Sequence, residues 1–144
     1  MEQQETRSAL VQRVSADLVV CRYKPGAVVD AGSIKENLQA RLEFHGSEPY
    51  GVVGIFPEDV EFDMSVLDKD HYTKPVLTDV TQVLALVAHG ELFDTIARMY
   101  LAMHPTKFAS QVFRMEHDAF FWVNSRISEW HEKNSTGEAR RVLG

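Results

Sequence analysis

The clearest pattern in the chain is a pair of continuous apolar runs, at residues 50–56 and 80–88. A run of this length that does not alternate with polar residues is typical of a parallel strand covered on both faces. We therefore predict two central strands at these positions. The first run contains Gly51 and Gly54. Glycines inside a strand mark a close approach of another element, so we expect a neighbour to pack tightly there.

Three stretches repeat apolar residues every three or four positions, as one face of a helix does. They span residues 33–45, 91–103 and 118–132. A fourth, short helix is expected after Asp63, which can cap it. Pro105 prevents the second long helix from continuing.

The first of these helices has predicted ends and a predicted core face. Asp30 is placed to cap its start, with Ser33 as the other candidate, and Gly46 is placed to end it. Ile34, Leu38 and Leu42 recur every four residues, which predicts that this stripe meets the core.

The remaining elements are strands. Residues 9–14 and 18–23 predict an opening β-hairpin, and residues 108–115 predict a further strand. Strands that alternate with helices imply crossovers and parallel pairing. The predicted fold class is therefore α/β (α+β), with a mixed sheet opened by a hairpin and with four helices. We expect a disordered N-terminus at 1–8, a single domain at 9–132 and a frayed tail at 133–144.

Size and charge restrict the function classes. A length of 144 residues suits one domain. The net charge of −6 argues against nucleic acid and anionic membranes as partners. Cys21 is the single cysteine, so an intramolecular disulfide is impossible. There is no apolar stretch of about 20 residues for a membrane span, and the polar start is unlike a signal peptide. These features predict a cytoplasmic protein.

Several segments resemble a known family. The sequence Tyr-Lys-Pro-Gly-Ala-Val-Val-Asp at 23–30, Val112-Phe113, Ala119 and Trp122-Val123 are similar to uncharacterised bacterial STAS-like (SpoIIAA-like) small proteins. These proteins are related in fold to anti-sigma-factor antagonists and to SEC14-like lipid-binding domains. The resemblance implies a STAS-like domain over the predicted 9–132 region and no assigned activity.

The anti-sigma antagonists also carry a phosphorylated serine at a helix start. The matching residue in this chain is Ser65, which we take as the phosphorylation candidate. The chain departs from that motif, because the Asp-Ser order and the following glycine are absent. The alternative is that Ser65 helps to cap its helix.

Polar side chains follow the ends of the predicted central strands. Asp59, His89, Glu116 and His117 are expected at one edge of the sheet, where ligands of parallel α/β sheets bind. Imidazole and carboxylate groups can act as an acid and base pair or hold a divalent metal. No metal-binding motif supports the second use, so we predict no metal and no cofactor. The alternative is that these are solvated capping residues.

The last predicted helix has more aromatic residues than one face can bury. Consecutive residues on a helix diverge by about 100°, so Phe121 or Trp122 must lie at an edge. We take Phe121, Trp122 and Trp130 as candidates for a subunit interface or an apolar pocket. Ordinary packing is the alternative. The pocket hypothesis predicts a lining of Phe93, Met99, Tyr100, Met103 and Trp122.

Three functions remain in view. The first is a non-enzymatic STAS-like binding or regulatory module that forms a homodimer. The second is a carrier of a small apolar ligand or lipid. The third is an enzyme that uses the His89 and His117 edge. The chain has no glycine-rich phosphate loop and no Gly-x-Ser-x-Gly motif, and we therefore predict no catalytic residues.

Overall fold

The structure is a computed structural model. It describes the backbone of residues 2–44 and 48–143 and the side chains of these residues as far as 133. The predicted C-cap at Gly46 lies outside the described residues.

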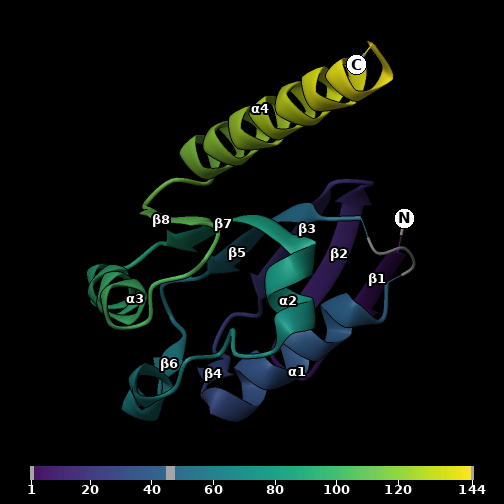
Figure 1. The fold of residues 1–144 in the computed structure, drawn as a ribbon. Coiled ribbons are helices and arrows are strands. Elements are labelled where there is room, and N and C mark those ends of the chain that lie inside the picture. Colours follow the sequence, from purple (N-terminus) through teal and green to yellow (C-terminus); the bar gives the residue numbers. More distant parts are fainter. Residues whose placement is uncertain (1, 45–47, 144) are drawn as a thin grey trace.

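Six strands form one mixed sheet in the spatial order β1-β2-β3-β5-β7-β8 (Figure 1). Their bounds are β1 Glu2–Glu5, β2 Ala9–Ser15, β3 Leu18–Tyr23, β5 Tyr50–Phe56, β7 Thr81–Ala88 and β8 Ala109–Phe113. The first three strands pair antiparallel, and the last four of the order pair parallel. β4 (Val28–Val29) and β6 (Glu61–Phe62) form a separate small parallel pair. The predicted mixed α/β sheet, opened by a hairpin, is therefore confirmed.

The N-terminus differs from the prediction. Residues 2–5 were expected to be disordered, but they form β1, which pairs antiparallel with β2 from Glu2 opposite Arg13 to Glu5 opposite Leu10. A polar strand at the edge of a sheet buries little side-chain surface. Backbone hydrogen bonds to β2 hold it, and apolar patterning cannot reveal such bonds.

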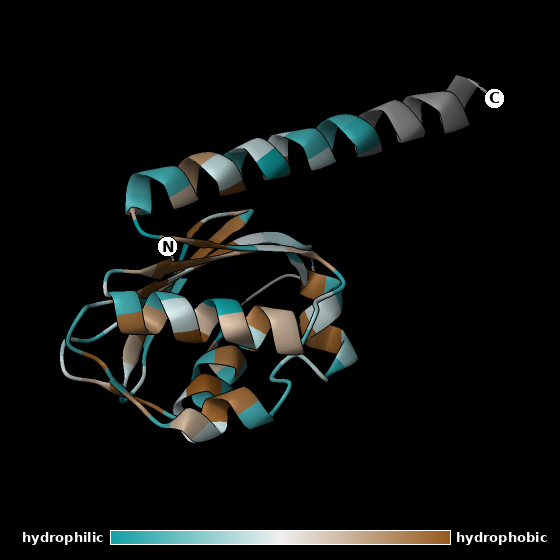
Figure 2. Cartoon of the chain, turned by 90° about the vertical axis from the view of Figure 1, so that its left-hand side faces the viewer, coloured by the Kyte–Doolittle hydropathy of each residue, from teal (hydrophilic) through white to brown (hydrophobic). Residues whose placement is uncertain are grey.

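The helices lie on both faces of the sheet. α4 (Glu116–Leu143) covers one face by itself. α1 (Ala31–Leu42), the short 3-10 helix η1 (Met64–Asp68) and α3 (Glu91–Met103) pack on the other face, and α2 (Pro75–Val80) leads into β7. Figure 2 shows the sheet as a layer between α4 and the other helices. The backbone of α4 remains helical to Leu143, so the tail predicted to fray from 133 is helical instead.

The two faces of the central strands have different partners. Val53 and Ile55 belong to the apolar cluster under α4, whereas Val52 and Phe56 belong to the cluster under α1 and α3. Gly51 lies against α4, because a Cβ placed there would stand 2.8 Å from Val123 Cγ1. The predicted close approach at Gly51 is thus confirmed.

At Gly54 the atom that approaches closely comes from the neighbouring strand β7 and not from a helix. Gly54 lies on the opposite face, and the nearest atom to an added Cβ is Leu86 Cδ2 at 3.3 Å. No helix side chain is among the three nearest atoms within 4 Å of that position. Gly54 leaves space above the sheet rather than admitting a helix.

α1 buries a different stripe from the one predicted. Its buried residues are Ser33, Asn37, Ala40 and Arg41, while Ile34, Leu38 and Leu42 are only half-buried. The reason is a buried polar network: Thr6 Oγ1 donates to Asn37 Oδ1 over 2.6 Å, and Asn37 Nδ2 donates to Ser8 Oγ over 3.0 Å. These bonds turn the polar stripe of α1 toward the hairpin. Ile34 and Leu38 of its apolar stripe face the space above Gly54.

Candidate functional site

The predicted strand-end cluster is partly assembled. His89 Nε2 lies 3.4 Å from Glu116 Oε2, and Arg22 Nη2 donates to Glu116 Oε1 over 3.1 Å. Arg22 comes from β3 and was not predicted. The hydrogen bond from Arg22 is the main cause that lowers the pKa of the Glu116 carboxyl, so this group is ionised at neutral pH. An ionised, half-exposed carboxylate in an ion pair is a poor proton donor.

Asp59 and His117 are exposed at the same edge. Within the part of the chain that the structure describes, their side chains form no hydrogen bond or ion pair with His89 or Glu116. Among the same residues, no group of three or more His, Cys, Asp or Glu side chains is placed to hold a metal ion. A role of this edge in ligand binding stays a prediction.

Ser65 lies in the first turn of η1. Its backbone N–H donates to Asp63 Oδ1 over 3.0 Å, which confirms Asp63 as the cap of this helix. The Ser65 side chain is exposed. Phosphorylation of Ser65 stays a prediction.

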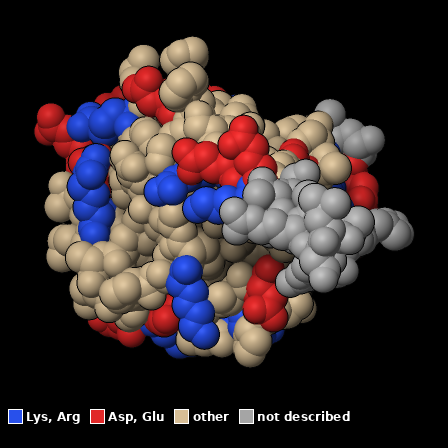
Figure 3. Space-filling model, turned by 45° about the horizontal axis from the view of Figure 1, so that its top comes forward, with Lys and Arg blue, Asp and Glu red and all other residues tan. Residues whose placement is uncertain are grey.

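The three aromatic candidates on α4 lie in different surroundings. Phe121 is 71% exposed. Trp122 is half-buried, with its ring 5.5 Å from that of Phe113 on the edge strand β8. Trp130 is half-buried, and its ring lies 5.2 Å from that of His131. On the face shown in Figure 3, Lys and Arg side chains lie among acidic and uncharged ones.

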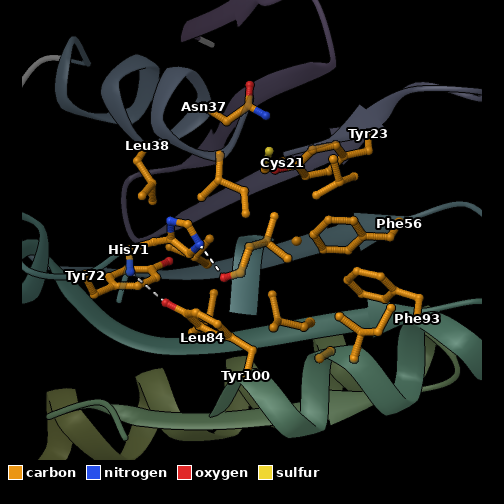
Figure 4. Close-up of a pocket in the computed structure, with 18 of the residues that line it drawn as sticks. Cys21, Tyr23, Asn37, Leu38, Phe56, His71, Tyr72, Leu84, Phe93 and Tyr100 are labelled. Carbon is orange, nitrogen blue, oxygen red and sulfur yellow. Dashed lines mark hydrogen bonds between the residues drawn. The ribbon is translucent and has the colours of Figure 1, made fainter. Parts of the chain in front are cut away.

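The structure contains a cavity of about 110 Å³ between the sheet, α1 and α3. Its lining is mostly apolar and comes from all of these elements. Figure 4 shows the cavity with His71 and Tyr72 at one end and the rings of Phe56 and Phe93 at the other. The lining residues are Cys21, Tyr23, Val29, Ile34, Asn37, Leu38, Arg41, Val52, Gly54, Phe56, Phe62, Val66, His71, Tyr72, Leu84, Leu86, Phe93, Ile96, Ala97 and Tyr100.

The cavity exists because small side chains coincide on its walls. Cys21 is paired with Gly54 in the sheet register, so neither β3 nor β5 places a large side chain on the floor at that level. Ala97 contributes only a methyl group from α3. Protein interiors are normally packed to the density of organic crystals. Three small residues from three separate elements therefore produce space that the surrounding large side chains do not occupy.

Aromatic rings close the far end of the cavity. The ring centroids of Tyr23 and Phe56 lie 4.3 Å apart, and those of Phe56 and Phe93 lie 4.1 Å apart. The ring of Phe62 follows at 4.6 Å from Phe93. These stacked and tilted rings form an apolar wall.

The other end of the cavity contains a buried arginine. Arg41 is 3% exposed, and no carboxylate among the described residues forms an ion pair with it. Nη1 donates to Thr81 Oγ1 over 3.3 Å and Nη2 to the Tyr72 hydroxyl over 3.4 Å, both longer than the usual 2.9–3.0 Å. The guanidinium carbon also lies 5.7 Å from the ring centroids of Tyr50 and Tyr72.

The burial of Arg41 is only partly compensated by these neighbours. Removing a cation from water costs several kcal/mol even after relaxation. Arg41 lies in the last turn of α1, where the helix dipole contributes about 0.3–1 kcal/mol. A cation–π contact contributes about 0.5–2 kcal/mol. The site therefore retains a positive charge that an anion would stabilise.

The other ionisable groups on the lining are uncharged at neutral pH. Burial raises the pKa of the Cys21 thiol to about 12 and raises those of the lining tyrosines. Burial also lowers the pKa of His71. His71 Nε2 lies 2.9 Å from the Val66 carbonyl oxygen, which can only accept, so this nitrogen carries the proton. The His71 backbone N–H donates to the Tyr100 hydroxyl over 2.9 Å.

A second hollow adjoins the cavity on the outside. It measures about 440 Å³ and lies between α1 and residues 68–77. Leu38 and His71 line both spaces, so the two hollows are neighbours. Lys35, Lys69 and Lys74 lie on the outer hollow.

An apolar pocket is present, but only part of the predicted lining belongs to it. Phe93 and Tyr100 line the cavity, as expected. Met99 and Met103 are exposed on the outer side of α3, and Trp122 belongs to α4, on the opposite face of the sheet. The prediction joined residues of two helices that are separated by the sheet.

Arg41 is the residue of this site that sequence reasoning missed. It follows Asn37 by four positions and lies on the buried stripe of α1, not on the apolar stripe that the sequence pattern predicted to be buried. The hydrophobic pattern therefore gave no signal for its burial.

Sequence comparison identifies a family for the chain. The profile of a family described as "Domain of unknown function (DUF7793)" matches residues 13–127. The chain belongs to this family. No curated protein sequence matches this DUF7793 member significantly.

Structural comparison supports the resemblance seen in the sequence. The DUF7793 chain is similar to the crystal structure of an uncharacterised protein of the DUF3478 family, with a SpoIIAA-like fold, from Shewanella loihica PV-4. The TM-score is 0.51 at 13% identity, and the match covers 81% of this chain and 92% of the other. The predicted SpoIIAA-like fold is therefore confirmed. In the described part of the chain, no helix is both long and apolar enough to cross a membrane.

Proposed function

We propose that the protein is a non-enzymatic binding module whose cavity takes a small apolar ligand. The observation that carries this proposal is the cavity of about 110 Å³ above Gly54. An unfilled space in a core forfeits dispersion contacts with its lining. A ligand of matching shape restores those contacts and is bound without moving the backbone.

The volume limits the size of the ligand. An engineered cavity of about 150 Å³ in another protein binds benzene. The present cavity is somewhat smaller, so we expect the buried body of the ligand to have no more than about six carbon atoms. A longer chain would have to extend past Leu38 and His71 into the outer hollow.

The test is to fill the cavity from α3. Ala97→Leu adds three carbon atoms to the cavity wall, and Ala102→Leu makes the same change at an exposed position of the same helix. We expect benzene and 1-hexanol to bind the wild type saturably in NMR titrations, with shift changes centred on the lining residues. Binding to Ala97→Leu should be at least 10-fold weaker, while Ala102→Leu should match the wild type.

Two results would contradict the proposal. One is that the wild type binds neither benzene nor 1-hexanol saturably. The other is equal binding by Ala97→Leu and Ala102→Leu, which would place the probes elsewhere. Turnover of a metabolite by the purified protein would contradict the non-enzymatic part.

We further propose that this module is regulatory, bacterial and cytoplasmic, and that it forms a homodimer. Phe121, which is 71% exposed, is the side chain through which we propose self-association, because aromatic residues are enriched at interfaces relative to the rest of the surface. Light scattering should give the mass of a dimer for the wild type and of a monomer for Phe121→Glu. A monomeric wild type would remove the dimer proposal. Cell fractionation of the source organism would test the location.

A further inference from the structure

We propose that the ligand of this cavity is a small monocarboxylate and that Arg41 binds its carboxylate group. This inference rests on the proposed function, because it names the class of ligand for the same cavity. It has its own evidence in the charge and the partners of Arg41.

Arg41 is a buried cation that has no anionic partner among the described residues. It is 3% exposed and lines the cavity, and no carboxylate of the described residues pairs with it. Buried arginines are almost always paired. The two neutral hydroxyls that it contacts accept only long bonds, at 3.3 and 3.4 Å.

The geometry of the guanidinium suits a carboxylate. An arginine has five N–H donors in one plane, and the described contacts use two of them. A carboxylate accepts two parallel N–H bonds from such a fork, and charge-assisted bonds of this kind are stronger than neutral ones. A neutral hydroxyl or amide cannot supply the opposite charge.

The lining favours a single negative charge. Apart from Arg41, its ionisable side chains are those of cysteine, tyrosine and His71, all uncharged at neutral pH. One cation balances one monoanion. The aromatic wall at Phe56 and Phe93 then faces the apolar body of the ligand (Figure 4).

The experiment compares two probes of nearly equal shape. Hexanoate and hexanamide have the same chain and differ at the head group in charge. We measure both affinities for the wild type at pH 7 by isothermal titration calorimetry, with NMR shifts to confirm binding at the cavity. Hydrogen bonds to a buried charged group predict hexanoate binding at least 10-fold tighter than hexanamide. Inorganic phosphate is not expected to bind in the cavity.

Variants assign the preference to one side chain. In Arg41→Met we expect hexanoate affinity to fall by about 10- to 100-fold, while hexanamide affinity changes less than about 3-fold. Arg41→Lys should retain part of the preference, because it keeps the charge without the planar fork. Lys35→Met, on the outer hollow of the same helix, is the matched control and should behave as the wild type.

The outcomes separate this inference from the proposed function. Equal binding of hexanoate and hexanamide at the cavity of the wild type would overturn the carboxylate inference and leave the apolar-ligand function standing. Tighter binding of phosphate than of hexanoate would also overturn it. If Arg41→Met does not fold, the wild-type probe pair and Arg41→Lys decide the question.

Discussion

Gly51 and Gly54 allow the cavity to be tested by stability alone. They lie three residues apart on β5 and face opposite sides of the sheet. Replacing either glycine by alanine removes about the same freedom from the unfolded chain, which stabilises a protein by about 0.4–1 kcal/mol. The difference between the two variants therefore reports on the folded surroundings of the added methyl group.

The structure gives different surroundings at the two positions. At Gly51 the added Cβ would lie 2.8 Å from Val123, 2.9 Å from Ile127 and 3.0 Å from Val83, and all three are buried. Overpacking of this kind costs about 1–3 kcal/mol.

At Gly54 the closest atom is the end of the Leu86 side chain, at 3.3 Å, beside an unfilled space. A shift of a few tenths of an ångström is easily accommodated there. We expect Gly54→Ala to change the free energy of unfolding by less than about 1 kcal/mol.

The assay is urea unfolding followed by circular dichroism. Gly51→Ala should be less stable than Gly54→Ala by about 1–3 kcal/mol, with equal m-values. In thermal melts the difference should be several degrees. If Gly54→Ala is as destabilised as Gly51→Ala, the space above Gly54 is not present in solution, and the cavity reasoning fails.

Three further predictions concern other parts of the molecule. Ile127→Ala should lower the free energy of unfolding by about 2–5 kcal/mol in urea titrations because Ile127 is buried on the side of α4 that faces the sheet, whereas the exposed control Asn124→Ala should stay within about 0.5 kcal/mol. Burial lowers the pKa of His71, so below about pH 6.5 the unfolded state binds a proton more readily than the folded state. Wild-type stability should therefore fall from pH 7.5 to 5 more than that of His71→Gln, and equal losses would contradict this assignment. Arg22 lowers the pKa of the Glu116 carboxyl. Their ion pair therefore stabilises the fold at pH values above the ordinary glutamate pKa, and this stabilisation is lost as the pH falls through the lowered pKa. Glu116→Gln should remove this part of the acid dependence, by at most about 1 kcal/mol because the pair is half-exposed, as unfolding curves at pH 7 and 3 would show.

The order of strands and helices was predictable because it is carried by side-chain patterns. The continuous runs at 50–56 and 80–88 became β5 and β7, and the helical repeats at 91–103 and 118–132 lie in α3 and α4. β1 was missed because a polar edge strand is held by its backbone.

The candidate site was less predictable for a physical reason. A cavity is made by side chains that are missing, here at Cys21, Gly54 and Ala97, and these positions meet only in three dimensions. The burial of Arg41 likewise depends on how α1 is turned, and Asn37 sets that turn through bonds to residues about 30 positions earlier. The Arg22 contact with Glu116 joins β3 to the start of α4 across 94 positions of sequence.

The single-helix cover of one sheet face has a consequence for folding on the ribosome. Val53, Ile55 and Val83 are shielded by α4, whose residues follow every strand in the chain. While the nascent chain lacks this helix, one apolar side of the sheet is open to the solvent and to other chains. Synthesis must therefore proceed past Ile127 before the domain can close, and a pause before that point would favour capture by a chaperone or aggregation.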